Sequence, residues 1–148
     1  MSVLLNYPLL AALTAIVAAQ FVKVPIFYLA KGRWAPGLAF GTGGMPSSHS
    51  AAVASMATAV ALRQGFSSPE FAIAAVVCAI TMYDAAGIRR QAGMHASAIN
   101  RMLLAVPELQ AGSPERQTLK ELLGHRPAEV LIGALLGIAI GFLFDWLA

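Results

Sequence analysis

Long apolar runs separated by short polar stretches dominate the chain. Four runs extend from about Val3 to Leu29, Ser48 to Leu62, Phe71 to Ala86 and Ala128 to Leu147. An α-helix rises about 1.5 Å per residue, so runs of this length approach or exceed what is needed to cross ~30 Å of hydrocarbon. The pattern predicts an all-α fold, an integral membrane bundle of about four transmembrane helices.

The composition of the chain supports a membrane protein rather than a soluble one. Of its 148 residues, 58% are hydrophobic and only 11% are charged, whereas soluble domains carry about 25% charged residues. A soluble fold of this size could not bury so much apolar surface. The single cysteine, Cys78, excludes an internal disulfide, and we interpret it as a small core residue. We expect residues 1–148 to form a single membrane-embedded domain, and we find no nucleic-acid-binding motif.

The basic residues gather on one side of the predicted bundle. Successive spans alternate in direction, so the ends of the first and third runs and the starts of the second and fourth share one membrane face. Nine of the ten Lys and Arg residues belong to this face, and only Arg63 lies at the other. The positive-inside rule places this face in the cytoplasm. The first run has no basic leader and is too long for a cleavable signal, so we expect it to remain as a span.

The stretch from Ile88 to Leu123 is the only long segment outside the predicted spans. Its first half carries apolar residues at approximately helical spacing, which predicts an amphipathic helix at the membrane interface. These residues are Met94, Ile99, Met102 and Leu103. We expect a turn at residues 111–114 and a second short helix that includes Leu119.

Candidate chemistry begins in the segment GGMPSSHS at residues 43–50, directly before the second apolar run. Ser47 or Ser48 is suited to cap a helix, and a helix N-terminus binds anions through its unpaired N–H groups and the positive end of its dipole. His49, in the first turn, could donate a proton to a group bound there. Alternatively, the segment is only a serine-rich cap followed by an interfacial histidine.

A second histidine precedes the fourth apolar run, in the segment LGHRPAEV at residues 123–130. Glu129 follows His125 by four residues, so its carboxylate can accept a hydrogen bond from one imidazole nitrogen and leave the other with a free lone pair. An imidazole held in this way is a competent nucleophile toward phosphorus. Alternatively, Glu129 is a charge that favours the helix start, and His125 is an interfacial residue.

Further polar residues on the same face predict a phosphate site. Lys23 is a cation inside an apolar run, which is costly in a bilayer and usually marks function, although its side chain could also reach the interface. Arginines after the third run match phosphate geometry, or alternatively they only mark topology. We assign phosphate binding to Lys23, Ser47, Ser48, Arg89 and Arg90. Three further residues are candidate supports for these groups, namely Gln20, Asp84 and Arg126.

These segments resemble the motifs of a known family. PSSH at residues 46–49 resembles the Pro-Ser-Gly-His motif of the type 2 phosphatidic acid phosphatases, which share a fold with the vanadium haloperoxidases. GHRPAEV at residues 124–130 resembles the last motif of that superfamily, in which Asp follows His by four residues. Together with YDAAGIRR at residues 83–90, the segments are similar to a divergent branch of the family. This resemblance covers nearly the whole chain.

The resemblance implies a phosphatase/haloperoxidase-like helical core and a two-step reaction without a metal or other cofactor. The histidine matching His125 would attack phosphorus to form a phosphohistidine, and the one matching His49 would protonate the leaving oxygen. Glu129 would orient His125, and water would then hydrolyse the intermediate. The chain departs from the family pattern where Ser48 replaces Gly and Glu129 replaces Asp. The first motif is also incomplete, because no Arg-Pro pair follows Lys23 at the family's spacing.

We therefore predict a membrane lipid phosphatase, a hydrolase that acts on a phosphate monoester or pyrophosphate of a lipid. The expected partners are a phosphorylated lipid, the bilayer and, because the spans are rich in glycine, a second copy in a homodimer. The expected location is a bacterial inner (plasma) membrane, with the site facing the cytoplasm. Two alternatives are a non-catalytic lipid-phosphate-binding protein and a small transporter subunit. The identity of the lipid and the role of His95 stay open.

Overall fold

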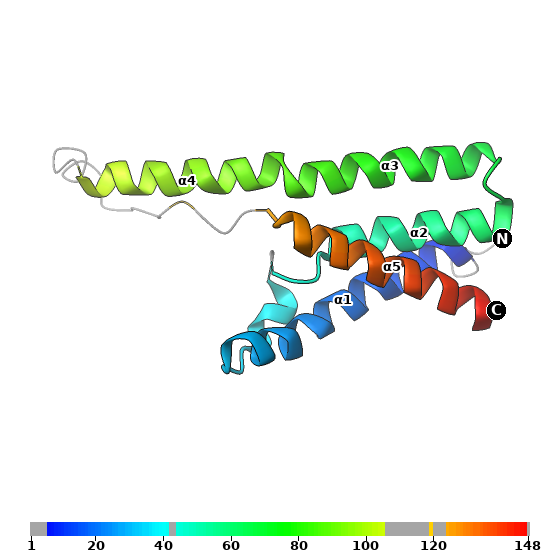
Figure 1. The fold of residues 1–148 in the computed structure, drawn as a ribbon, viewed down its shortest axis with the longest axis horizontal. Helices are drawn as coiled ribbons and strands as arrows, with labels where there is room; N and C mark the ends of the chain where they lie inside the picture. Colours follow the sequence, from blue (N-terminus) through cyan, green and yellow to red (C-terminus); the bar gives the residue numbers. More distant parts are fainter. Residues whose placement is uncertain (1–5, 42–43, 106–118, 120–123, 148) are drawn as a thin grey trace.

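The computed structural model describes residues 6–41, 44–105, 119 and 124–147, except for the side chains of Phe40 and Arg89. Over these residues the structure is helical and contains no strand (Figure 1). The elements are α1 (Tyr7–Lys31), the 3-10 helix η2 (Pro36–Phe40), α2 (Ser48–Gln64), α3 (Pro69–Ala86), α4 (Ile88–Ala105) and α5 (Pro127–Leu147). The predicted all-α fold is confirmed, and the ends of the four apolar runs agree with helix ends to within about one helical turn.

Capping side chains fix where the main helices begin. Asn6 caps α1, because its Oδ1 accepts a hydrogen bond from the N–H of Leu9 at 3.1 Å. Ser47 caps α2 and Ser68 caps α3 in the same way. Such caps satisfy N–H groups that have no partner inside the helix. The expected serine cap of α2 is therefore present, and it places His49 in the first turn of that helix.

Helix α2 lies at the centre of the bundle, and α1, α3 and α5 pack around it (Figure 1). By length and composition, three helical stretches of the described chain could cross a membrane: α1, the continuous stretch Pro69–Ala105, and α5. Helix α2 has 17 residues and buries Ser48, Ser50 and Ser55. Because α2 contacts protein on several sides, it does not need the apolar surface of a lipid-facing span. We expected four spans. The structure instead packs three apolar helical stretches around α2, which is shorter and more polar.

Glycines allow α5 to pack directly against the backbone of α2. Gly133, Gly137 and Gly141 recur every four residues, so they lie on one side of α5. A Cβ atom at Gly133 would overlap the carbonyl oxygen of Ser47, and one at Gly137 would overlap that of Ala51. Small residues permit such close approach between membrane helices. This packing holds the beginning of α5 beside the beginning of α2.

A polar cluster joins α1, α2 and α5 near the C-terminal end of α2. Arg63 Nε lies 3.2 Å from Asp145 Oδ1, and its guanidinium carbon lies 4.2 Å from the centroid of the Tyr7 ring. The Tyr7 hydroxyl donates to the carbonyl oxygen of Gly141 at 3.4 Å. These contacts connect α1, α2 and α5. The sequence singled out Arg63 only as an isolated cation, because its partners come from distant parts of the chain.

Helix α4 continues the line of α3 and extends past the ends of the other helices (Figure 1). The Asn100 amide donates to the carbonyl oxygen of Leu119 at 2.8 Å and accepts from the N–H of Leu119 at 3.0 Å. The predicted amphipathic helix is confirmed as a helix. The expected second helix does not include Leu119, which is not helical. The expected turn at residues 111–114 lies outside the described residues.

Candidate functional site

Two histidines from separate helix tips lie together at one end of the bundle. The ring centroids of His49 and His125 are 6.3 Å apart, and the ring planes are inclined by 60°. His49 is exposed in the first turn of α2, whereas His125, just before α5, is only 4% exposed. Two imidazoles at this separation can both contact one phosphate group.

Glu129 holds His125 in one orientation. Its Oε2 lies 3.1 Å from Nδ1 of His125 and also accepts from the backbone N–H of Arg126 at 3.2 Å. A carboxylate at Nδ1 selects the imidazole tautomer with its proton on Nδ1, and Nε2 then carries the lone pair. His125 can therefore present Nε2 as a base or as a nucleophile.

Backbone hydrogen bonds tie the segment before α5 to two other helices. The His125 N–H donates to the carbonyl oxygen of Ala85, near the end of α3, at 3.0 Å. The Ser47 N–H donates to the carbonyl oxygen of Glu129 at 3.0 Å. Gly124 makes the preceding turn at φ 84°, a conformation that side chains disfavour. The position of His125 is thus fixed by α2 and α3 as well as by its own helix.

The first turn of α2 brings the groups of an anion site next to the histidines. Ser47 Oγ accepts from the N–H of Ser50 at 3.3 Å and from its hydroxyl at 3.1 Å, so this side chain serves as the helix cap. Ser48 is buried at the first position of the helix. The N–H groups of a first turn have no partner within the helix, and the helix dipole is positive there. A phosphate beside His49 would be favoured by both effects.

Lys23 approaches this region from α1. Its side chain is 4% exposed, and Nζ donates to the carbonyl oxygen of Gly41 at 3.5 Å. The ammonium group also interacts electrostatically with the carboxylate of Glu129. One turn earlier on α1, Oε1 of Gln20 is buried without a hydrogen-bond partner among the described atoms. Lys23 is thus buried within the bundle and interacts with the carboxylate that bonds to His125.

The other assigned residues lie near the end of α3, on α4 and just before α5. Arg90 is exposed on α4, and Arg126 is exposed just before α5. Asp84 is half-buried near the end of α3, and the side chain of Arg89 lies outside the described part of the chain. His95 is exposed on α4, which extends away from the bundle (Figure 1). Glu129 contacts His125 directly, and Lys23 interacts electrostatically with Glu129.

Several contacts of the site leave no signal in the sequence. The carbonyl oxygens of Ala85 and Gly41 accept from His125 and Lys23, and a backbone carbonyl is present at every residue whatever its type. The sequence shows that the spans are rich in glycine but not that the glycines of α5 face α2. Within the described ranges, no three His, Cys, Asp or Glu side chains are arranged to hold a metal ion.

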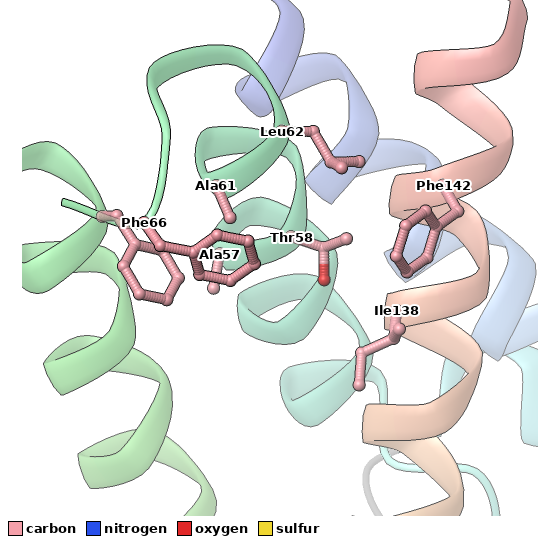
Figure 2. A pocket seen from close by; sticks show the side chains of 8 residues that line it. Ala57, Thr58, Ala61, Leu62, Phe66, Ile138 and Phe142 are labelled. Carbon is pink, nitrogen blue, oxygen red and sulfur yellow. The ribbon is translucent and has the colours of Figure 1, made fainter. Parts of the chain in front are cut away.

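An apolar cavity lies away from the histidines, between α2, α3 and α5 (Figure 2). Its volume is about 240 Å³. Eight residues line it: Ala57, Thr58, Ala61, Leu62, Phe66, Phe71, Ile138 and Phe142. The Thr58 hydroxyl donates to the carbonyl oxygen of Ala54 at 2.8 Å, so it is already bonded within α2. The lining of this cavity is therefore apolar and suited to contact with hydrocarbon. The cavity is not part of the polar site.

The helical bundle and its two-histidine site define an integral membrane protein in which three helix tips meet around a pair of imidazoles. A family model described as the Divergent PAP2 family matches residues 4–140, and the chain belongs to this family. A similar curated protein is the "Uncharacterized membrane protein YuiD" of Bacillus subtilis (strain 168). It is 45% identical over 149 residues, covering 95% of this chain and 94% of that protein. No solved structure gives a significant match. The resemblance drawn from the motifs is confirmed.

Proposed function

We propose that this chain is a lipid phosphatase that hydrolyses a phosphate monoester or pyrophosphate of a lipid without a metal. One observation supports this function most directly. His125 Nδ1 lies 3.1 Å from Glu129 Oε2, and the His125 ring centroid lies 6.3 Å from that of His49. One imidazole is thus oriented as a nucleophile, and a second lies beside it as a proton donor.

In the first step, Nε2 of His125 forms a bond to phosphorus, and the bond from phosphorus to the lipid oxygen breaks. The leaving oxygen takes a proton from His49, which becomes neutral. Glu129 stabilises the positive charge that develops on the His125 ring, because its carboxylate stays bonded to Nδ1. The lipid alcohol, or the lipid monophosphate when the substrate is a pyrophosphate, then leaves.

In the second step, water attacks the phosphorus of the phosphohistidine, and the nitrogen–phosphorus bond breaks. Neutral His49 accepts the proton that the water loses, so both histidines return to their starting states. Inorganic phosphate is the second product. The same residue acts as the acid in one step and as the base in the next, as microscopic reversibility requires.

Charge on the phosphate would be balanced by the buried ammonium group of Lys23 and by the first turn of α2, including Ser47 and Ser48. Arg89 and Arg90 would add positive charge from the start of α4. Lys23 could balance this charge although the Arg-Pro pair of the family's first motif is missing. Its ammonium group is close enough to interact electrostatically with Glu129, the partner of His125. The phosphate is thus held by groups from α1, α2 and α4.

The position of the site favours a lipid as the substrate. Both histidines lie at the tips of helices that are embedded in the membrane, which is where a lipid headgroup meets water. The excess of basic residues on this face favours the cytoplasmic side of a bacterial inner membrane. A phosphorylated headgroup could therefore reach the histidines while its chains stay in the bilayer.

The test is release of inorganic phosphate by the purified protein in detergent and EDTA. The substrate panel is phosphatidic acid, phosphatidylglycerophosphate and a polyprenyl pyrophosphate. We expect release from at least one of these lipids, and inhibition by vanadate, which mimics the transferred phosphate. Saturable binding of these lipids with no release of phosphate would contradict the proposal and would support the alternative of a non-catalytic lipid-phosphate-binding protein.

A further inference from the structure

Helix α4 carries an apolar stripe that the described part of the bundle leaves exposed. Ile88, Ile99 and Met102 are 64%, 44% and 64% exposed. Together with Ala92 and His95 they follow a spacing of four and three residues, which keeps side chains on one side of a helix. The main helical contact of α4 is with α3, and α4 extends beyond α1, α2 and α5 (Figure 1).

The charge on α4 is entirely basic. The helix contains Arg89, Arg90 and Arg101, and no Asp or Glu occurs between residues 85 and 107. Arg90 and Arg101 are exposed. A turn of 3.6 residues places both of them on the side of the helix opposite Ile99. An apolar stripe with arginines on the other side is typical of helices that bind a membrane surface.

We propose that α4 binds an anionic lipid surface, with Ile88, Ile99 and Met102 inserted at the boundary between headgroups and chains. The arginines would remain among the lipid phosphates, where basic residues are attracted to an anionic leaflet. Helix α4 follows α3 in the continuous stretch Pro69–Ala105, which is long and apolar enough to cross a membrane. It begins at the face on which the sequence places most of the basic residues. The surface of the bilayer is therefore within its reach.

This binding requires a bend at one residue. Gly87 is the only residue between α3 and α4, which follow one line in the structure (Figure 1). Glycine accepts a wide range of backbone conformations, and helix ends are where hinges commonly lie. A bend at Gly87 would lay α4 against the membrane. The binding does not depend on phosphatase activity.

Charge also favours lipid over a second copy of α4 as the occupant of the stripe. Two copies packed through their stripes would leave Arg90 and Arg101 on the outer sides of the pair, and α4 has no Asp or Glu that could neutralise them. An anionic headgroup layer neutralises the same arginines. His95, within the stripe, is compatible with the hydrated headgroup region.

The test uses the whole protein, with Cys78→Ala to remove the native thiol, in vesicles of phosphatidylcholine alone or mixed with phosphatidylglycerol. An environment-sensitive fluorophore is attached to Ile99→Cys or, as the matched control, to Ser97→Cys on the other side of α4. Lipids carrying a nitroxide at headgroup level serve as quenchers. We expect the probe at 99 to be quenched far more in the mixed vesicles, and the probe at 97 to stay in water in both.

Neutralising the arginines tests the electrostatic part of the binding. In Arg90→Gln/Arg101→Gln, the ratio of docked to undocked α4 should fall roughly fivefold for each lost charge. Equal quenching of both probes, or equal quenching of the probe at 99 in both lipid mixtures, would overturn the proposal. A probe at 99 that is shielded from water but is not quenched by lipid would also overturn it, because a protein surface would then cover the stripe.

Discussion

The two ends of helix α2 carry polar groups of different kinds. At its first turn, His49 lies beside His125, with Lys23 and Glu129 nearby. In its last turn, roughly 20 Å along the helix, Arg63 is bound to Asp145 and lies over the ring of Tyr7. Both ends join α1, α2 and α5, but their polar groups are satisfied differently.

At the Arg63 end, opposite charges meet within the protein. Arg63 and Asp145 form an ion pair at 3.2 Å, and each side chain keeps about two-fifths of its surface exposed, 41% and 38%. At the histidine end, the ammonium group of Lys23 is buried, and among the described residues it donates one long hydrogen bond, to a neutral carbonyl oxygen. The carboxylate of Glu129, which interacts electrostatically with Lys23, is also bonded to His125. A buried charge is costly unless it is well compensated. The Arg63 end fastens the helices together, and we propose that the histidine end receives an anion.

The largest expected effect is the loss of turnover in His125→Ala. Removing the nucleophile should lower phosphate release by about ten-thousand-fold or more, while the helical content stays unchanged. His95→Ala is the matched control, because His95 is an exposed histidine on α4, and it should retain full activity. Phosphate release near the wild-type rate in His125→Ala would remove His125 from the mechanism.

His49→Ala should have a smaller effect that depends on the leaving group. Loss of the general acid should slow hydrolysis of a lipid monoester by about a thousand-fold. With p-nitrophenyl phosphate the loss should be much smaller, since that leaving oxygen needs no proton. Rates for the two substrates in both proteins would check this prediction. Equal losses for both substrates would mean that His49 is not the proton donor.

Gly137→Ala should disturb the packing that places both histidine tips together. The new Cβ would overlap the carbonyl oxygen of Ala51, so α5 must move away from α2. We expect a loss of stability of about 2 kcal/mol and reduced turnover, checked by thermal unfolding in detergent. Gly37→Ala is the control, because a Cβ there meets no atom within 4 Å. Equal stability of the two variants would contradict the close α2–α5 contact.

Arg63→Gln should have the smallest effect. The ion pair with Asp145 is partly exposed and screened, so its loss should cost only about 0.5 kcal/mol. Turnover should stay at the wild-type level, because this cluster is distant from the histidines. A cycle with Asp145→Asn would isolate the pair energy by thermal unfolding. A large fall in phosphate release with little change in stability would contradict a purely structural role for this end.

The fold was largely predictable from local signals. The apolar runs and the serine cap of α2 are properties of short segments, so their effects can be inferred from neighbouring residues in the chain. The central position of α2 was not predictable, because burial of Ser50 and Ser55 depends on which helices surround them. The partners of Arg63 were missed for the same reason, since Tyr7 and Asp145 lie far from it in sequence.

For the site, the motifs indicated which side chains to examine but not how they are held. The spacing of His125 and Glu129 predicted their contact, because four residues make about one helical turn. The hydrogen bonds from His125 to the Ala85 carbonyl and from Ser47 to the Glu129 carbonyl require the three-dimensional packing of three helices. Arg89 and Arg90 were assigned by charge alone, and charge does not determine where a flexible side chain lies.

Trapping the covalent intermediate is the most direct measurement. The protein would be mixed briefly with a lipid substrate carrying radioactive phosphate, quenched in alkali and digested, and the labelled peptide identified. If His125 is the nucleophile, we expect an acid-labile, alkali-stable label on the peptide that contains His125. The label should be absent from His125→Ala and retained in His95→Ala. Rapid phosphate release with the label on another residue, or with no trapped label at any time, would contradict attack by His125.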